Sequence, residues 1–441
     1  MSITLNEHQA KAVNHKDSAL LVIAGPGSGK TRVIVERVEF LTKNGIPSEN
    51  ILCLTFTHKA TDEMKDRLEK KGIVDATVST YHSFCRDLCA ENAEVTGLGK
   101  GTKIIPKSSM LVWCMKNTDS FNFDPNVIDF SADHISVYTA MHEGISNFKE
   151  EMATPDDLEK WLDAEQKSLD ELSDGEKTKK DNIRRQDYVL RHREFNKVYR
   201  RYIEYEKEKM LVDYDDMINK AITLLKTSQI VLDDCHEKYK YILVDEFQDN
   251  NYAQYELLKL LSKDANVTTV GDDDQLIYSF QGADSNNFTS FEEDFKPIEK
   301  IFLEENYRST KCIVDTAKLL LPKSTSKKLY SNLEKGEPVH IVRPDDDKAE
   351  LEFVLKTIQN LVGTKFTHRE RGESTLQYKD FAILSRKKDT GDKFAQILKS
   401  YNIPSTYVGN YNIFSNPIIH ELIDYLKATS SPSTNGQTLY K

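Results

Sequence analysis

ALLVIAGPGSGKT, residues 19–31, joins a short apolar run to a glycine-rich loop. The apolar part, residues 19–24, has the length and composition of a buried strand. After the loop, Ile34, Val38 and Leu41 recur at helical spacing. The sequence therefore predicts a strand, a glycine loop and a helix, which is the usual first unit of a parallel α/β fold.

The loop has the composition of a phosphate-binding loop. Its residues are Ala24, Gly25, Pro26, Gly27, Ser28, Gly29, Lys30 and Thr31, with Ala24 where the strict pattern has glycine. Glycines let backbone N–H groups turn inward around phosphate oxygens, and the following helix presents its positive end to the same anion. We expect Lys30 to reach the β- and γ-phosphates of ATP and the Thr31 hydroxyl to hold Mg²⁺.

Further buried-strand patterns occur along the chain, and helical patterns separate most of them. They are residues 51–56, 76–80, 241–246, 267–272, 301–305, 339–343 and 381–385. This alternation is typical of parallel sheets that are covered by helices. The predicted fold class is therefore α/β, with the parallel sheet of a P-loop NTPase.

The strand signal vanishes between about 93 and 211, where the sequence is polar, charged and helical. Phe195, Val198 or Tyr199, and Tyr202 are spaced along one helix face, so we predict a helical insertion. Within the insertion, residues 163–186 are the most polar stretch, and we expect them to be mobile or solvated.

The chain has 441 residues, enough for about three domains. We predict a first α/β domain from residues 1–92 and 212–298, interrupted by a helical subdomain at 93–211. A second α/β domain is expected at 299–441.

Composition limits the class of protein. With 60 basic and 71 acidic residues the net charge is -11, so a nucleic acid would have to meet a local basic channel. No apolar run approaches the length of a membrane span, and the N-terminus does not resemble a secretion signal. Among six cysteines only Cys85 and Cys89 are close together, and one pair cannot fill a tetrahedral metal site. We expect free thiols and a cytoplasmic protein.

Asp245 and Glu246 follow the apolar residues 241–244. Alone, the pair could be a strand-terminal turn with solvated acids. If the phosphate loop lies at an adjacent strand end, Asp245 can bind its metal ion and Glu246 can polarise the attacking water. We expect this second arrangement, which is that of a nucleotide hydrolase.

Several further motifs occur in order along the chain. They are LNEHQ (5–9), LTFTHKATDEM (54–64), STYHSF (79–84), VDYDDM (212–217), VDEFQDNNYAQ (244–254), VGDDDQLIYSFQGAD (270–284) and LEENYRST (303–310). Together with the phosphate loop, this set closely resembles the UvrD/Rep-type superfamily 1 DNA helicases. The resemblance runs from Leu5 to about Ser433. It implies a RecA-like first domain with a helical insertion and an incomplete second RecA-like domain.

The resemblance also implies roles at the nucleotide site. Gln9 would read adenine and Tyr307 would lie near it. Gln275 would sense the γ-phosphate and couple it to DNA, and Arg308 would be an arginine finger from the second domain. The expected nucleotide-binding set is Gln9, residues 24–31, Arg32 and Tyr307, and the catalytic set is Lys30, Asp245, Glu246, Gln275 and Arg308.

The implied partners are single-stranded DNA and duplex junctions. The expected DNA-binding residues are Phe56, Thr57, Lys59, His82, Tyr278 and Phe280. Phe56, Tyr278 and Phe280 would offer aromatic faces to bases. Phe56 could instead be a core residue, and His82 could either contact phosphate or cap a turn.

The sequence departs from the family pattern in three ways. Gln281 stands where the family usually has arginine, and Leu276 replaces a usual serine. Two further family motifs, one with a second arginine, do not occur before Lys441. The expected activity is ATP-dependent 3' to 5' translocation and unwinding in DNA repair or replication, weakened by these missing motifs. The alternative is a truncated, nucleotide-gated single-stranded DNA-binding protein without processive motor activity.

Overall fold

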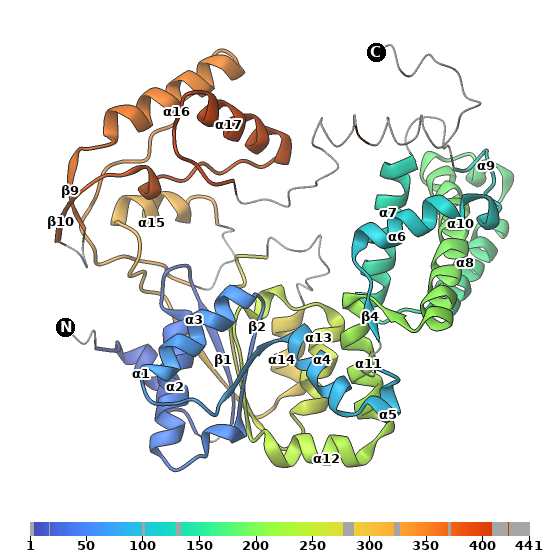
Figure 1. Ribbon diagram of the computed structural model, residues 1–441, viewed down its shortest axis with the longest axis horizontal. Coiled ribbons are helices and arrows are strands. Elements are labelled where there is room, and N and C mark those ends of the chain that lie inside the picture. The colour runs from blue at the N-terminus through green and yellow to red at the C-terminus, as the bar shows by residue number, and fades with distance from the viewer. Residues whose placement is uncertain are drawn as a thin grey trace. The chain divides into compact units, whose positions relative to one another are not determined.

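A six-stranded sheet organises the first part of the chain in a computed structural model (Figure 1). The structure describes residues 4–16, 18–98, 102–128, 134–276, 286–321, 327–368, 372–407 and 422. The strand order is β3-β2-β6-β7-β1-β8, and all pairings are parallel. The strands are β1 (Ala19–Ala24), β2 (Ile51–Thr55), β3 (Thr77–Thr80), β6 (Tyr241–Val244), β7 (Asn266–Gly271) and β8 (Ile298–Leu303). The predicted α/β class is confirmed.

Helices cover both faces of this sheet. They are α1 (Glu7–Asn14), α2 (Lys30–Lys43), α3 (His58–Glu69), α4 (Tyr81–Glu91), α11 (Tyr214–Thr227), α12 (Gln229–Lys238), α13 (Tyr252–Leu261) and α14 (Asn287–Asp294). Short 3₁₀ turns, η1 (Ser48–Asn50) and η3 (Phe247–Asp249), precede β2 and follow β6.

The alternation of side chains along each strand assigns the helices to the two faces. Leu21 and Ile23 of β1 pack in one core with residues of α4, α11, α13 and α14. Leu20 and Val22 point the other way and pack with α1, α2 and α3. Because both faces are covered, the strands β1, β2 and β6 are almost entirely apolar, as is typical of parallel strands. Figure 1 shows the two helical layers on either side of the strands.

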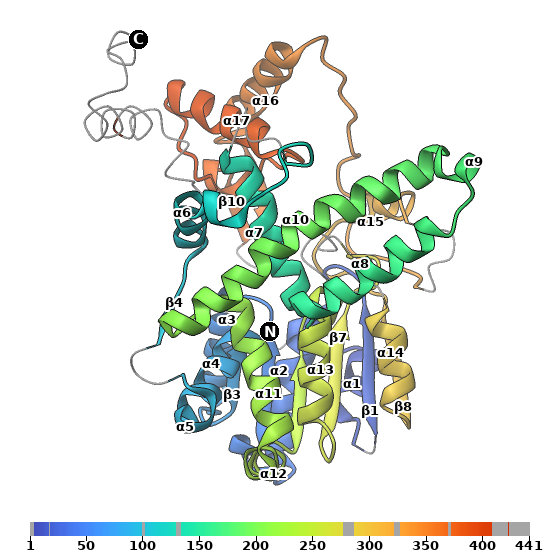
Figure 2. The ribbon, with the colours of Figure 1, turned by 90° about the vertical axis from the view of Figure 1, so that its right-hand side faces the viewer.

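The segment between α4 and α11 is mostly helical. Its elements are α5 (Ala93–Thr96), β4 (Lys103–Ile104), α6 (Lys107–Lys116), η2 (Thr118–Phe121), α7 (His134–Glu150), α8 (Pro155–Asp170), α9 (Asp174–Lys177), α10 (Lys180–Lys209) and β5 (Leu211–Val212). Phe195, Val198, Tyr199 and Tyr202 lie in its buried core, on the α10 face that the sequence indicated. Residues 163–186 form the neighbouring ends of α8 and α10 with α9 between them (Figure 2). There Arg185 Nε lies 2.6 Å from Glu165 Oε1.

One buried lysine connects this segment to the sheet domain. Lys149 Nζ of α7 lies 3.0 Å from Glu206 Oε2, 2.6 Å from Asp213 Oδ2 and 2.9 Å from Asp216 Oδ1. Burial opposes the charged form of Lys149, but Asp213 and Asp216 raise its pKa above the ordinary value. The packing of α7 against α10 and α11 therefore includes buried ion pairs as well as apolar contacts.

The chain divides into two compact units, residues 1–339 and 340–441. The sequence placed the start of the second α/β domain at residue 299, inside β8. In the structure β8 pairs with β1 from Ala19 opposite Ile298 to Ala24 opposite Leu303. The residues after β8, including α15 (Lys311–Lys318), also belong to the first unit. The domain assignment at 299 remains a prediction.

The second unit is small in its described part. It contains α16 (Asp347–Leu361), the antiparallel pair β9 (Lys365–His368) and β10 (Gly372–Thr375), the turn η5 (Tyr378–Asp380) and α17 (Lys388–Ser400). Leu355, Leu398 and Ile403 form its core.

Two predicted strands at this end of the chain are wrong. Residues 339–343 and 381–385 have no strand assignment. Ile341 is 88% exposed and Leu384 is 94% exposed, although both belong to apolar runs. A strand is stable only when a neighbour pairs with its backbone groups. Among the described residues neither run has such a neighbour.

The six cysteines are free thiols, and burial raises the pKa of Cys89 to about 11. Cys85 and Cys89 both face the core from α4. In the described part of the chain, no helix is both long and apolar enough to cross a bilayer.

Arg37 is a fully buried arginine that joins α2, α1 and β7. Its guanidinium donates to the carbonyl oxygens of Ala12, Val13 and His15, to Thr268 Oγ1 at 2.9 Å and to Asn266 Oδ1 at 3.0 Å. These contacts satisfy carbonyls at the end of α1 that the helix cannot satisfy itself. Burial lowers the pKa of Arg37 to about 10, so the side chain stays charged at neutral pH.

We expect Arg37→Met to lower the free energy of unfolding by about 3 kcal/mol, because several buried carbonyls lose a charged donor. Arg37→Lys should lose less, since it keeps the charge but fewer donors. Urea denaturation followed by circular dichroism measures both. Arg86→Met at an exposed position is the control and should change stability by less than about 0.5 kcal/mol. Equal stability of Arg37→Met and the parent would contradict this account.

Candidate active site

The predicted catalytic residues follow three strands that end at the same edge of the sheet. Lys30 and Thr31 follow β1, Asp245 and Glu246 follow β6, and Gln275 follows β7. We expected the first two strands to be adjacent, and this was wrong because β7 lies between them. Strands are only about 4.8 Å apart, so long side chains from β1 and β6 can still meet across β7.

The phosphate loop turns where its glycines adopt left-handed backbone angles. Gly27 has φ +69° and Gly29 has φ +88°, values that side chains with a Cβ rarely adopt. Ser28 is buried, and its Oγ donates to the Gly25 carbonyl at 2.7 Å. The first N–H groups of α2 have no acceptor within the helix and face the loop end, where an anion is favoured.

Two contacts join the loop to the end of β6. Lys30 Nζ lies 2.7 Å from Glu246 Oε2, and the Lys30 side chain is only 10% exposed. The Thr31 hydroxyl donates to Asp245 Oδ2 at 3.1 Å. The structure thus brings together all four residues that the sequence assigned to phosphate, metal and water.

Two acidic residues after β6, Asp245 and Asp249, have raised pKa values. Burial, and then the charge of Glu246, raise the pKa of Asp245 to about 6, while Lys30 opposes this shift. Burial and Glu246 likewise raise the pKa of Asp249 to about 6. A further positive charge at this edge would therefore be stabilised by carboxylates that are short of counter-charge.

Glu246 has an unusual backbone. Its φ is +50°, in the left-handed region that disfavours residues with a Cβ. Gln248 holds the side chain in place, because its Nε2 donates to Glu246 Oε2 at 2.8 Å. Gln248 Oε1 in turn accepts the backbone N–H of Asp272 at 2.9 Å. The end of β6 is therefore tied to the end of β7.

Gln275 lies just beyond β7 and folds back on it. Its Nε2 donates to Asp272 Oδ2 at 2.8 Å, and its backbone N–H donates to the Asp272 carbonyl at 3.0 Å. Asp272 is fully buried. Gln275 is therefore joined to Glu246 through Asp272 and Gln248.

Gln9 and Tyr307, the two residues expected at adenine, are linked through Asn6. Gln9 is buried and donates to the Ser28 carbonyl at 2.8 Å. Asn6 caps α1 in a reciprocal box with Gln9, and its Nδ2 donates to Tyr307 Oη at 2.8 Å. The Tyr307 hydroxyl donates to Glu305 Oε2 at 2.5 Å. The start of the chain and residues 305–307 thus meet beside the phosphate loop.

Arg308 lies against the loop at its Cβ atom. A Cβ added to Gly27 would lie 2.8 Å from Arg308 Cβ, so no other residue fits at 27 without a shift. Asn306 fixes this approach, because its Nδ2 donates to the Pro26 carbonyl at 2.6 Å and its Oδ1 accepts the N–H of Arg308 at 2.8 Å. The Arg308 side chain is exposed. In the structure Arg308 belongs to the first compact unit.

Four of the expected DNA-binding residues lie where β2 and β3 end. Phe56 is half-buried, and Thr57 and Lys59 are exposed at the start of α3, where Thr57 Oγ1 caps the helix by accepting from Ala60. His82 lies in the first turn of α4, and burial followed by His58 lowers its pKa. Tyr214, 59% exposed, meets the His82 ring edge-on at 6.5 Å between centroids.

A buried hydrogen bond links the segment after β6 to the start of α4, at the same edge of the sheet. Asn250 Nδ2, four residues after Glu246, donates to Tyr81 Oη at 2.7 Å, and Tyr81 immediately precedes His82. Asn250 itself is fixed by Asn287, whose Nδ2 donates to the Asn250 carbonyl at 2.7 Å. A shift at Glu246 can therefore reach the α4 terminus through few groups.

Tyr278 and Phe280, the other expected DNA contacts, lie outside the described residues, as does Gln281. Arg32 is half-buried in the first turn of α2, next to Thr31.

Reasoning from sequence missed Gln248, Asn306 and Lys327. Gln248 and Asn306 lie inside quoted motifs, so their polar side chains between assigned residues were a usable signal. Lys327 Nζ contacts Asp272, Asp273 at 2.5 Å and Asp274 at 2.9 Å. No local pattern around residue 327 points to this contact.

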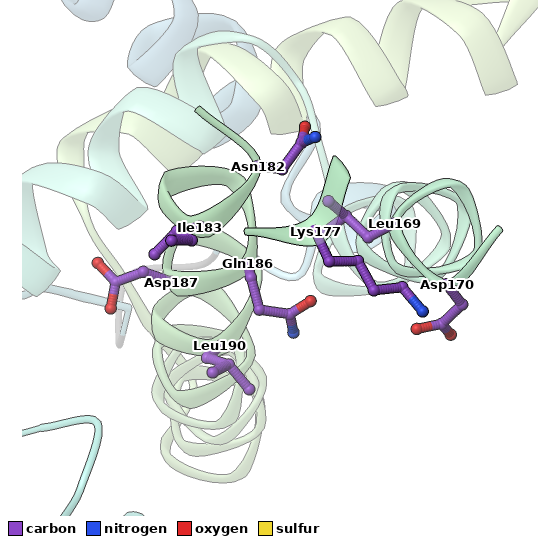
Figure 3. Close-up of a pocket in the computed structure, with 8 residues that line it drawn as sticks. All are labelled: Leu169, Asp170, Lys177, Asn182, Ile183, Gln186, Asp187 and Leu190. Atoms are coloured by element: carbon purple, nitrogen blue, oxygen red, sulfur yellow. The ribbon is translucent and has the colours of Figure 1, made fainter. Parts of the chain in front are cut away.

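A hollow of about 480 Å³ lies elsewhere, between α8, α9 and α10 (Figure 3). Its lining residues are Leu169, Asp170, Lys177, Asn182, Ile183, Gln186, Asp187 and Leu190. None of the predicted nucleotide or DNA residues is among them. The hollow therefore has no part in the site at the sheet edge.

Comparison with known proteins supports the resemblance. Residues 5–296 match the UvrD/REP helicase N-terminal domain, and residues 301–437 match the UvrD-like helicase C-terminal domain. The ATP-dependent DNA helicase Rep of Buchnera aphidicola subsp. Baizongia pistaciae is 31% identical over 98% of this chain and 59% of its own length. The ATP-dependent DNA helicase PcrA of Staphylococcus aureus strain NCTC 8325 is 33% identical over 96% of this chain and 53% of its own.

A further relative, the ATP-dependent DNA helicase PcrA of Leuconostoc citreum, is 31% identical over 98% of this chain and 53% of its own length. The chain thus spans a little over half the length of these curated relatives. The N-terminal domain match covers more than half of the 441 residues. By this match and the ordered motifs that carry it, the chain belongs to the UvrD/REP helicase family.

Proposed function

We propose that the chain binds and hydrolyses ATP and uses this reaction to act as a helicase or translocase on single-stranded DNA. The observation that supports this most strongly is the pairing of Lys30 with Glu246 at 2.7 Å and of Thr31 with Asp245 at 3.1 Å. The relatives named as ATP-dependent DNA helicases support the choice of ATP and DNA.

The residues at the β1 and β6 ends fit a magnesium ion. Mg²⁺ takes oxygen ligands, and Thr31 Oγ1 and Asp245 Oδ2 are oxygens 3.1 Å apart. Burial raises the pKa of Asp245. A cation bound beside the carboxylate would lower this pKa again. We assign Thr31 and Asp245 as the residues that would hold Mg²⁺. When bound, the ion would neutralise charge on the phosphates.

We propose the remaining roles from the resemblance, and the positions of the residues support them. The α2 N-terminus and the loop backbone would hold the phosphates, and Lys30 would balance their β and γ charges. Glu246 would take a proton from the attacking water, because its carboxylate lies beside Lys30 and is oriented by Gln248. Gln275 would sense the γ-phosphate, and the exposed guanidinium of Arg308 would stabilise the transition state.

At the base end, we assign Gln9, Arg32 and Tyr307 to nucleotide binding. Gln9 contacts the phosphate-loop backbone, and Tyr307 is joined to Asn6 of the same helix cap. These contacts, which keep both side chains close to the phosphate loop, support the assignment.

Single-stranded DNA would bind at the ends of β2 and β3. Phe56 would stack on a base, Thr57 and Lys59 would contact phosphates, and His82 would contact the backbone or a base. Tyr278 and Phe280 are kept as stacking residues on the strength of the resemblance. The 3' to 5' direction, the duplex junction and a cytoplasmic role in DNA repair or replication rest on the same resemblance.

A second candidate function is a nucleotide-gated DNA-binding protein that is not a processive motor. The exposed apolar runs at 339–343 and 381–385 support it, because they leave the described part of the second unit with few buried apolar contacts, which lowers local stability. Many ATP turnovers per chain, stimulated by single-stranded DNA, would favour the helicase. ATP binding that changes DNA affinity with slow turnover would favour the gated binder.

We expect Lys30→Ala to abolish ATP binding and hydrolysis. Glu246→Gln should instead keep ATP affinity within about threefold of the parent and lower turnover at least about a hundredfold, because only the general base is lost. Titration with a fluorescent ATP analogue and phosphate release in the presence of oligonucleotide separate the two effects. Glu94→Gln, at an exposed position on α5, is the matched control. Turnover at the parent rate in Glu246→Gln would show that Glu246 is not the base.

DNA affinity tests the second assignment. Phe56→Ala should weaken binding of a labelled single-stranded oligonucleotide by about 1–3 kcal/mol, because a stacked base loses its platform. Phe40→Ala, a half-buried phenylalanine of α2 on the other side of the fold, is the matched control and should leave the Kd unchanged. Fluorescence anisotropy measures both. If Phe56→Ala also binds like the parent, Phe56 is a core residue only.

A further inference from the structure

Lys327 is a buried lysine that none of the motifs includes. Its side chain has no exposed surface. Its Nζ contacts the carboxylates of Asp272, Asp273 at 2.5 Å and Asp274 at 2.9 Å. Burial opposes the charged form of this lysine, but hydrogen bonds to Asp272 and Asp273 raise its pKa above the ordinary value. The ammonium is thus the counter-charge for three consecutive aspartates at the end of β7.

Asp272 is the residue through which Lys327 meets the active site. The same carboxylate that contacts Lys327 accepts Gln275 Nε2 at 2.8 Å and the N–H of Asp274 at 3.2 Å. The Asp272 backbone N–H is held by Gln248, the residue that orients Glu246. A continuous set of polar contacts therefore runs from Lys30 through Glu246, Gln248 and Asp272 to Lys327.

The segment that carries Lys327 also lies against the phosphate loop and against the residues around Arg308. We call residues 327–331 the strap. Leu329 packs on the phosphate loop so closely that a Cβ on Gly25 would lie 2.0 Å from Leu329 Cδ2. Tyr330 pairs with the residues around Arg308, since its carbonyl accepts the N–H of Asn306 at 2.8 Å and its N–H donates to the Glu304 carbonyl at 3.0 Å.

The strap continues this pairing at its end. Ser331 Oγ donates to the Ser309 carbonyl at 2.8 Å. Residues 304–309 are thus held by the loop on one side, through Asn306 and Pro26, and by the strap on the other. Lys327 fixes the strap to the end of β7 by charge.

We propose that Lys327 is a positioning residue of the nucleotide site, which holds the Gln275 turn and the Arg308 segment in one arrangement around the phosphates. This inference rests on the proposed function. Lys327 does not touch the phosphates itself. It acts through Asp272, which sets Gln275, and through the strap, which sets Asn306 and Arg308.

The test compares Lys327→Met, which keeps the length but loses the charge, with Lys327→Arg, which keeps the charge. Lys327→Met should lower DNA-stimulated turnover at least about tenfold while the affinity for a fluorescent ATP analogue changes less than about threefold, because Lys30 and the loop are intact. Lys327→Arg should recover most of the turnover.

Lys149→Met is the matched control. Lys149 is also buried against three carboxylates, but these belong to α10 and α11 and its cap rather than to the nucleotide residues. Thermal denaturation reports the stability that each variant loses. If Lys149→Met lowers turnover as much as Lys327→Met does, the effect is general destabilisation and the positioning role is wrong.

Hydrogen exchange gives a readout that does not need hydrolysis. In the full chain, Lys327→Met should speed amide exchange in residues 272–275 and 304–309, and Lys149→Met should not. Unchanged exchange in both segments would overturn the inference, and so would faster exchange with unchanged turnover. A parent chain that neither binds nor hydrolyses ATP would instead contradict the proposed function, and the exchange result alone would then decide whether Lys327 holds the two segments together.

Discussion

The position of β7 between β1 and β6 is the constraint on which the candidate active site depends. Parallel strands end at one edge, so this order places the phosphate loop, the Asp245–Glu246 pair and the Asp272 turn side by side. Lys30 reaches across β7 to Glu246, and Gln248 crosses the shorter gap to the Asp272 backbone. Gly271 at the end of β7 leaves room for this, because a Cβ there would lie 2.8 Å from Gln248 Oε1.

Charge balance at this edge is unusual and explains why lysines are buried there. Acidic residues end two neighbouring strands, and burial raises the pKa of Asp245 and Asp249. Lys30 pairs with Glu246 after β6, and Lys327 pairs with Asp272 after β7. Such an arrangement favours a ligand that brings a cation with it, as a magnesium nucleotide does. A further buried contact at this edge, from Asn250 to Tyr81, connects the segment after Glu246 to the start of α4, where His82 lies.

The sequence was informative where function and local structure depend on neighbouring residues. The β1 strand, its loop and α2 were readable from residues 19–41, and so was the position of Asp245 and Glu246 directly after an apolar strand. The strand order was not readable, because apolar runs do not say which run lies beside which. Residues 339–343 and 381–385 looked like strands but lack described partners. Lys327 was not predictable, since its 55-residue separation from Asp272 leaves no local pattern.

The central claim is that Lys30 and Glu246 mark the place where the γ-phosphate is bound and cleaved. A crystal structure of the chain with Mg²⁺ and a non-hydrolysable ATP analogue tests it most directly. We predict the phosphates on the α2 N-terminus, Lys30 Nζ within hydrogen-bond distance of a β- or γ-phosphate oxygen, and Glu246 beside the γ-phosphorus with Gln248 still in contact. A nucleotide bound elsewhere, or bound here with the Lys30–Glu246 pair unchanged, would contradict it.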